Sequence, residues 1–183
     1  MVDSRLTDSE GTLLALVVRA QPITAYQIAR VYDRSPVTNY NTSKGKIYPM
    51  IRRLTADGLL RAEAMRGDAR GTEQLSCTSA GQAAVRNWVM DLRPNHLLLD
   101  DPLRTKVQSF DLLTVQERLE WIADAKAGLR SKLQELEAYG RDVTVPFKEA
   151  VHSNALNSIR ARLDWLDELL IGLVKSKARQ KNQ

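Results

Sequence analysis

A run of basic side chains between residues 34 and 70 is the clearest chemical feature of this 183-residue sequence. The segment carries eight basic and three acidic residues, so its excess of five positive charges equals the net charge of the whole chain. Lysine and arginine bind phosphate through charge-assisted hydrogen bonds, and such clusters are typical of nucleic-acid-binding surfaces. A cluster of this size also occurs on ordinary solvated surfaces, so the motifs around it must distinguish a nucleic-acid-binding surface from a solvated one.

The most informative basic residues fall on one face of an expected helix. An apolar stripe at helical spacing marks the buried side of this helix: Ile47, Met50, Ile51 and Leu54. The opposite face carries small residues, cations and a tyrosine, which favours close approach to DNA phosphates. We therefore predict a DNA contact by this helix, by the start of the preceding helix and by a basic turn that follows. The candidate DNA-binding residues are Tyr26, Gln27, Ser43, Lys44, Gly45, Lys46, Tyr48, Arg52, Arg66 and Arg70.

Three nearby polar residues have competing explanations. Arg53 and Arg61 could pair with the acidic residues Asp57 and Glu63 instead of with phosphate. Gln27 could donate to a phosphate beside the helix dipole, or its side chain could be used in capping its own helix.

Capping signals predict where the first helices begin and end. Ser9, Thr24 and Ser43 suit the N-cap positions of three successive helices, because a side-chain oxygen there accepts from a free backbone N–H. Gln27 completes a capping box with Thr24, and Gly58 suits the C-cap of the third helix.

After Gly58 the apolar pattern changes to a period of two. Residues 59–65 and 72–77 alternate on either side of a glycine-containing turn, which predicts a β-hairpin. Thr78 then suits the N-cap of a fourth helix, which Pro94 ends. Three helices followed by a hairpin is the order of a winged helix-turn-helix, in which the third helix enters the major groove. We place this DNA-binding domain at residues 1–94.

Residues 95–183 are expected to form a helical dimerisation domain. Asp101-Pro102 starts a short helix, Thr114 opens a long helix that Gly140 ends, and a last helix begins near Pro146. Heptad-like apolar spacing on the two long helices leaves surface for a partner chain. The predicted fold is thus mainly α, a winged helix-turn-helix followed by a C-terminal antiparallel helical dimerisation domain. The candidate dimerisation residues are Val115, Ile122, Leu129, Leu156, Ile159, Leu163, Leu166 and Leu170.

Several of these motifs together resemble the PadR family of bacterial regulators. The matching residues are Gly45–Leu54, Asp57-Gly58-Leu59, the glycines at 67 and 71, and Thr78-Ser79-Ala80-Gly81. The Tyr48-Pro49 pair makes the match specific, because proline inside a helix costs a backbone hydrogen bond. The resemblance extends over the longer C-terminal helical (virulence-activator alpha type) domain and so covers nearly the whole chain.

The resemblance implies a dimeric winged-helix repressor, less often an activator, acting on operator DNA. Two-fold symmetry of such a dimer predicts a palindromic operator. Some family members respond to phenolic acids or other flat aromatic compounds. One departure concerns the second wing strand, Thr72–Cys77, which lacks the basic and tyrosine residues usual in the family. We therefore expect the backbone contacts of the wing at Arg66 and Arg70.

Three tryptophans are candidates for contact with a small aromatic effector. Trp88, Trp121 and Trp165 each lie on an apolar helical stripe, and stacked aromatic side chains bind flat molecules well. Tryptophans on such stripes also pack in cores, which is the competing interpretation.

No catalytic or metal-binding motif accompanies these features. His96, His152 and the single cysteine, Cys77, are isolated, and neither a phosphate-binding loop nor a nucleophile motif occurs. We predict no enzyme activity, no metal and no cofactor, with Cys77 as a buried filler or else a redox sensor. The apolar run 13–18 is too short for a signal peptide or a membrane span, which predicts a cytoplasmic protein without a membrane partner.

Two other kinds of protein fit parts of this pattern. A MarR-like regulator also has a winged helix, but its dimerisation usually involves a helix before that domain, whereas here the additional helices follow it. A coiled-coil adaptor could use the winged helix to contact protein, and salt-dependent binding to duplex DNA would distinguish it from a regulator.

Overall fold

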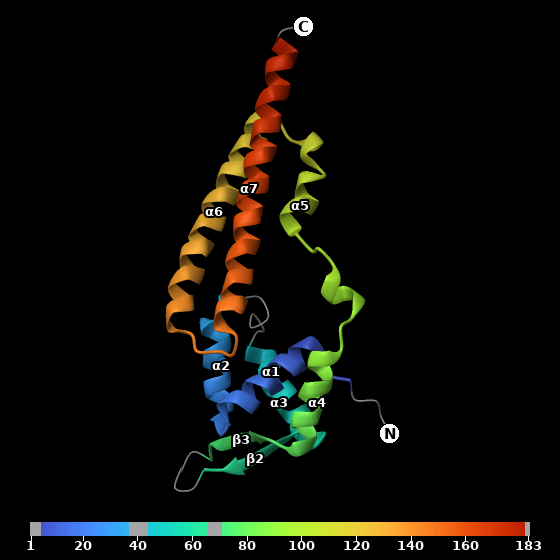
Figure 1. Ribbon diagram of the computed structural model, residues 1–183, viewed down its shortest axis with the longest axis vertical. Helices are drawn as coiled ribbons and strands as arrows, with labels where there is room; N and C mark the ends of the chain where they lie inside the picture. Colours follow the sequence, from blue (N-terminus) through green and yellow to red (C-terminus); the bar gives the residue numbers. More distant parts are fainter. Residues whose placement is uncertain (1–4, 37–43, 66–70, 182–183) are drawn as a thin grey trace. The chain divides into compact units, whose positions relative to one another are not determined.

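The computed structural model describes residues 5–36, 44–65 and 71–181 of the chain (Figure 1). The chain forms two compact units, Met1–Leu98 and Leu99–Gln183, and each is described by itself. The sequence places the boundary at residue 94, whereas the units divide after residue 98, beyond the 3-10 helix η2 (Pro94–Leu97).

The first unit is a winged helix-turn-helix, as predicted. Strands β2 and β3 form the antiparallel wing, with Ala62 opposite Leu75. A short third strand, β1, pairs with the other edge of β3, so the sheet order is β1-β3-β2. The elements are α1 (Asp8–Ala20), β1 (Ile23–Thr24), α2 (Ala25–Arg34), α3 (Lys44–Ala56), β2 (Leu60–Ala64), β3 (Glu73–Cys77), α4 (Ser79–Met90) and η2.

Local capping fixes the ends of these helices. Thr24 and Gln27 form the predicted capping box of α2, and Thr78 accepts from the backbone N–H of Gly81 to cap α4. Gly58 follows α3 with a φ of 72°, a left-handed conformation that glycine adopts without strain. The prediction for α1 is wrong, because Thr7 rather than Ser9 is its N-cap.

One continuous core holds the helices of the first unit to its sheet. The side chains of the predicted stripe of α3 lie in it, with Ile47, Ile51 and Leu54 buried and Met50 packed at its edge. Deep burial of these side chains fixes which face of α3 remains exposed. The most deeply buried members are Leu13, Leu14, Val17, Ile28, Ile47, Leu54 and Leu75.

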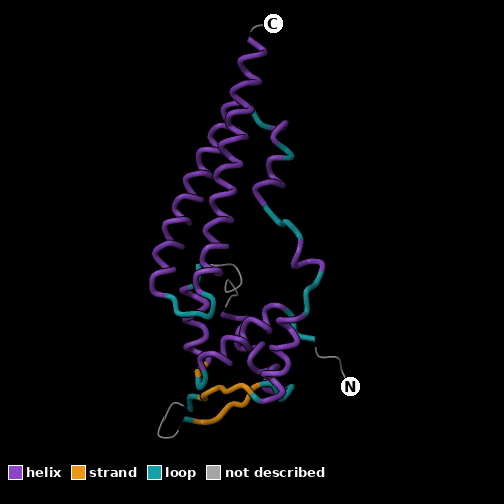
Figure 2. The backbone as a smooth tube through the Cα atoms, in the orientation of Figure 1, coloured by secondary structure: helices purple, strands orange, loops and turns teal. Residues whose placement is uncertain are grey.

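The second unit is a long antiparallel helix pair with two short helices beside it (Figure 2). Helix α6 packs along α7, and the C-terminal part of α7 extends beyond the start of α6 (Figure 2). Phe110, Ile122 and Leu166 form the small buried core of this unit. The elements are α5 (Pro102–Val107), η3 (Phe110–Leu112), α6 (Val115–Asp142) and α7 (Lys148–Lys181).

The caps of the second unit follow the sequence signals at the helix starts but not at Gly140. Asp101 caps α5, and Thr114 forms a capping box with Glu117 at the start of α6. Gly140 does not end α6, which continues to Asp142. A Cβ at Gly140 would collide with the imidazole of His152, so the glycine allows close packing of α6 and α7 instead.

None of the helices within the described residues is long and apolar enough to cross a membrane.

Candidate nucleic-acid interface

Helix α3 presents a compact polar face to solvent. Because Ile47, Ile51 and Leu54 are buried, the side chains on the other side of the helix point outward. Tyr48 is 45% exposed although it is a large aromatic residue. Gly45 and Pro49 add little bulk to this side, which permits close approach of a ligand. The exposed residues on this face are Gly45, Lys46, Tyr48, Pro49 and Arg52.

The cations of this region differ in whether an acidic partner neutralises them. Within the described part of the chain, neither Lys46 nor Arg52 has an ion-pair partner. Arg61 pairs with Glu63 at 3.2 Å, as one of the two sequence interpretations expects. Arg53 pairs with Glu10 of α1 and not with Asp57. Among the described side chains of α3, the positive charge without an acidic partner therefore lies at Lys46 and Arg52.

The start of α2 offers two further polar groups. Tyr26 is 65% exposed. The Gln27 side-chain oxygen accepts from the Thr24 backbone N–H at 2.8 Å, so the capping interpretation of this residue is confirmed. Its side-chain NH₂ group is the part that could still donate to a phosphate. Both residues stand in the first turn of a helix, where the backbone dipole favours anions.

Several predicted contacts cannot be placed. Ser43, Arg66 and Arg70 lie outside the described residues, and Lys44 begins α3 but its side chain is not described. The wing strands β2 and β3 themselves lie at residues 60–64 and 73–77.

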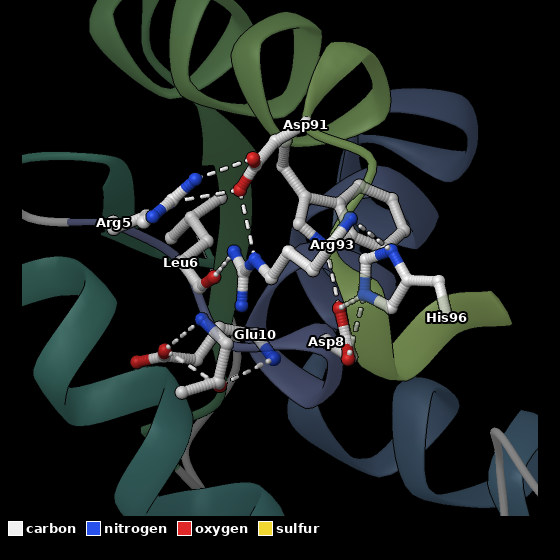
Figure 3. Close-up of polar contacts among 9 residues, drawn as sticks. Arg5, Leu6, Asp8, Glu10, Asp91, Arg93 and His96 are labelled. Carbon is white, nitrogen blue, oxygen red and sulfur yellow. Dashed lines mark hydrogen bonds and ion pairs between the residues drawn. The ribbon is translucent and has the colours of Figure 1, made fainter. Parts of the chain in front are cut away.

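A polar network joins the first residues of the unit to the end of α4 (Figure 3). Arg5 and Arg93 both donate to the carboxylate of Asp91, which lowers the pKa of Asp91 from 3.8 to about 2. Arg93 also donates to the carbonyl oxygen of Leu6 at 2.7 Å. We call this network the N-terminal clamp. It comprises Arg5, Leu6, Asp8, Trp88, Asp91, Arg93 and His96.

Asp8 forms the second half of the clamp. It accepts from the indole Nε1 of Trp88 at 3.1 Å and lies 3.2 Å from Nε2 of His96. The other ring nitrogen of His96 accepts from the Arg93 backbone N–H at 3.2 Å, so the histidine caps η2. Sequence reasoning missed this network, because the bonds that join residues 5–8 to residues 88–96 span 80 to 88 positions and no local pattern links their partners.

The three tryptophans occupy different surroundings. Trp88 packs against Gly11 of α1 and donates to Asp8, which gives it a structural part in the first unit. Trp121 meets Phe110 edge-on, with ring centroids 5.1 Å apart. Trp165 packs partly buried against the same core of the second unit. Trp121 and Trp165 therefore belong to one aromatic cluster, and Trp88 does not.

Neither the single cysteine nor the metal-ligating residue types show a reactive arrangement among the described residues. Burial raises the pKa of the Cys77 thiol, which disfavours the reactive thiolate and supports the filler interpretation. Within the described residues, no group of three or more His, Cys, Asp or Glu side chains could hold a metal ion.

The predicted dimerisation residues divide into two sets. Ile122, Ile159 and Leu166 are buried within the second unit itself, so they have no surface to offer a partner. This corrects their assignment, and the reason is that α6 and α7 cover each other along this row. Of the other residues, Val115 is exposed, whereas Leu129, Leu156, Leu163 and Leu170 are half-buried, and Leu129 and Leu170 pack against the core of the second unit.

Leu156, Leu163 and Leu170 recur every seven residues on a flank of α7 beside the buried row. The exposed Val174 continues this flank by one further turn. We call these four residues the α7 flank.

The fold defined by these units is that of a winged-helix protein with an appended helix pair. No protein-family model matches the sequence, and none of the curated proteins matches it. Solved structures of PadR-family transcriptional regulators do share the fold, as the sequence motifs predict. Bacillus subtilis PadR in complex with operator DNA superposes with a TM-score of 0.75 at 19% identity, over 90% of this chain and 98% of that chain.

Two further structures show the same fold. Bacillus subtilis PadR in complex with p-coumaric acid has a TM-score of 0.73 and 17% identity, with 91% of this chain and 95% of that chain covered. A PadR-like transcriptional regulator from Bacillus cereus has a TM-score of 0.71 and 16% identity, with 94% and 99% covered. The shared fold thus includes the C-terminal helices as well as the winged helix.

Proposed function

We propose that this chain is a PadR-type transcriptional regulator that binds operator DNA through helix α3. The observation that carries the proposal is the outward face of α3, where Lys46 and Arg52, beside Tyr48, have no acidic partner among the described residues. A helix of this position in a winged helix-turn-helix is the one that enters the major groove. A structural neighbour with the same fold was solved on its operator.

Each exposed group has a distinct expected role at the DNA. Lys46 and Arg52 would bind phosphate or the acceptor edge of guanine, and Tyr48 would contact bases or sugar through its ring and hydroxyl group. Tyr26 and Gln27 would donate to a phosphate at the start of α2. Ser43 just before the helix, Lys44 at its first position, and Arg66 and Arg70 between the wing strands complete the proposed contact set.

The second unit would hold two winged helices on a palindromic operator. One winged helix buries too little surface for useful specificity, so two copies must read half-sites about 34 Å apart or a multiple of it. Helix α7 has 34 residues and is about 51 Å long, which is sufficient to support this spacing. The α7 flank, with Val115 and Leu129, is the proposed contact between copies. A dimer seated on its operator would act as a repressor by blocking transcription.

A flat aromatic effector is a further part of the proposal. One structural neighbour was solved with p-coumaric acid, and the aromatic cluster of Trp121 and Trp165 is the candidate region in this chain. Binding of p-coumaric acid should quench tryptophan fluorescence, and Trp121→Phe should remove most of the change. Unchanged quenching in Trp121→Phe with loss in Trp88→Phe would place the effector elsewhere.

Selection of bound DNA from a random pool tests the function directly. The expected result is a palindromic consensus, bound by the full chain with an affinity that falls steeply as salt rises. Recovery of no sequence, together with salt-independent or absent binding to duplex DNA, would overturn the proposal and favour a protein-binding adaptor.

A further inference from the structure

Glu10 is a buried charged residue at the start of α1. It is 5% exposed and is the only buried polar or charged residue among those the structure describes. Its Oε2 accepts from the Thr7 backbone N–H at 2.8 Å and from the Thr7 hydroxyl group at 2.7 Å. Its Oε1 forms an ion pair with the guanidinium group of Arg53. A carboxylate removed from water needs such partners, because an unpaired buried charge is strongly destabilising.

The partner of Glu10 belongs to the proposed recognition helix. Arg53 directly follows Arg52 on α3, and its side chain is 56% exposed. Consecutive residues are about 100° apart around a helix, so the two arginines leave α3 in different directions. Arg52 lies on the outward face, whereas Arg53 extends to α1 and is neutralised there. The fold thus neutralises the charge of Arg53 through Glu10, whereas the charge of Arg52 has no acidic partner among the described residues.

The position of Glu10 is itself fixed. Thr7 and Glu10 form the capping box of α1, and the N-terminal clamp ties the residues around Thr7 to the end of α4 (Figure 3). The backbone around Glu10 is therefore held by the capping box of α1 and by the clamp. Apart from the Glu10–Arg53 ion pair, α3 rests mainly on α2 and strand β2. The ion pair adds a link from α3 to α1, at the C-terminal half of α3.

We propose that Glu10 is a positioning residue for operator recognition, acting through Arg53. It holds the C-terminal half of α3 against α1 and keeps the Arg53 charge from binding DNA phosphate indiscriminately. This inference rests on the proposed DNA-binding function. A freed Arg53 adds affinity for any duplex, because phosphate contacts carry no sequence information, while a loosened α3 loses base contacts. Removal of either partner should therefore lower the ratio of operator affinity to random-duplex affinity.

The test compares four variants of the full chain: Glu10→Gln, Arg53→Gln, their combination, and Arg53→Lys. Gln at position 10 keeps an oxygen that can accept from Thr7, so the cap of α1 is preserved. Operator and random-duplex affinities are measured at several salt concentrations, after thermal unfolding has confirmed a folded winged helix. Arg52→Gln is the matched control, since it removes an adjacent cation that has no acidic partner in the described structure.

The expected loss in the affinity ratio is about tenfold for Glu10→Gln and for Arg53→Gln, the size of one charge-assisted hydrogen bond. The combined variant should lose no more than either single variant, because both remove one interaction. Arg53→Lys keeps the charge pair and should stay close to the parent. Arg53→Gln should leave the salt slope for the operator unchanged, whereas Arg52→Gln should flatten it by about one unit.

Three outcomes would overturn the inference while leaving DNA binding intact. They are additive losses in the combined variant, a flattened salt slope for Arg53→Gln, and a parental affinity ratio for Glu10→Gln. If Glu10→Gln fails to fold, the comparison of Arg53→Gln with Arg53→Lys decides, because residue 53 is exposed and Glu10 keeps its two hydrogen bonds from Thr7 in both variants. If the parent chain itself selects no DNA, the proposed function fails first.

Discussion

The winged-helix unit and the helical unit use their apolar side chains differently. In the first unit, helices α1, α2 and α3 and the sheet bury their apolar faces in one core that includes Leu13, Ile28, Leu54 and Leu75. In the second unit Phe110, Ile122 and Leu166 form one small buried core and Leu136 and Ile159 are buried apart from it, while other apolar side chains remain exposed along α7. The first unit completes a large core within one chain, although Val89, Met90 and Leu92 around the end of α4 stay exposed, whereas the second unit has a small core and exposed apolar surface on α7 for a partner.

The largest expected effect comes from charges on the α7 flank. Leu163→Glu combined with Val174→Glu should dissociate the proposed homodimer, because two carboxylates from each chain would face an apolar contact. Loss of the second half-site should weaken operator binding by about a hundredfold or more. Analytical ultracentrifugation and DNA binding measure the two effects.

Asn157→Glu with Ala161→Glu is the matched control for this variant. Both residues are exposed on α7 away from the flank, so the dimer should persist. A folded flank variant that still forms a dimer would locate the interface elsewhere. Leu166 is unsuitable for this test, because it is fully buried and its replacement by Glu would disrupt the second unit itself.

The next effect concerns stability within the second unit. Leu166→Ala should lower the free energy of unfolding by about 2–5 kcal/mol, through lost apolar contact and the cavity left behind. Leu163→Ala, on the flank, should cost less within the monomer. Denaturant titration at matched protein concentrations measures both. Equal losses, with dimerisation unchanged in both variants, would contradict the division of α7 into a buried row and a flank.

Truncations on the outward face of α3 should each have a smaller effect. Lys46→Ala and Arg52→Ala should weaken operator binding about tenfold and flatten its salt slope by about one unit each. Tyr48→Ala should weaken binding without changing the slope, since tyrosine carries no charge. Arg86→Ala is the control, because Arg86 is an exposed cation on α4. Parental slopes for both Lys46→Ala and Arg52→Ala would remove α3 from the interface.

The smallest expected effect is the pH dependence of the N-terminal clamp. Asp91 has its pKa lowered from 3.8 to about 2 by Arg5 and Arg93. A lowered carboxylate pKa stabilises the folded state above about pH 4, and this contribution disappears as pH falls towards 2. Asp91→Asn should therefore melt slightly below the parent at pH 6, and the difference should vanish near pH 2. A constant difference across this range would assign the effect to packing.

The sequence predicted features that depend on neighbouring residues. The capping boxes at Thr24 and Thr114, the left-handed Gly58 and the wing strands all follow from patterns a few residues long. The buried stripe of α3 also follows from one helical period, and it determines which residues of the candidate site face outward.

Features that depend on distant partners could not be predicted in this way. The Arg53 ion pair with Glu10 and the clamp around Asp91 join segments that lie far apart in the sequence, and no helical or strand repeat links them. Gly140 looked like a helix end, because its contact with His152 on another helix is invisible in a local pattern. Likewise, a heptad spacing on α7 does not say which of its two rows is covered by α6.

The N-terminal clamp also has a consequence for the order of folding. Its long-range hydrogen bonds join residues 5, 6 and 8 to residues 88, 91, 93 and 96, separations of 80 to 88 positions. The entropy of closing so long a loop is lost before any clamp bond forms, so these contacts arise late. During synthesis the start of α1 is therefore held by the clamp only after residues 88–96 have emerged from the ribosome. The α6–α7 hairpin, made of neighbouring segments, has no such delay.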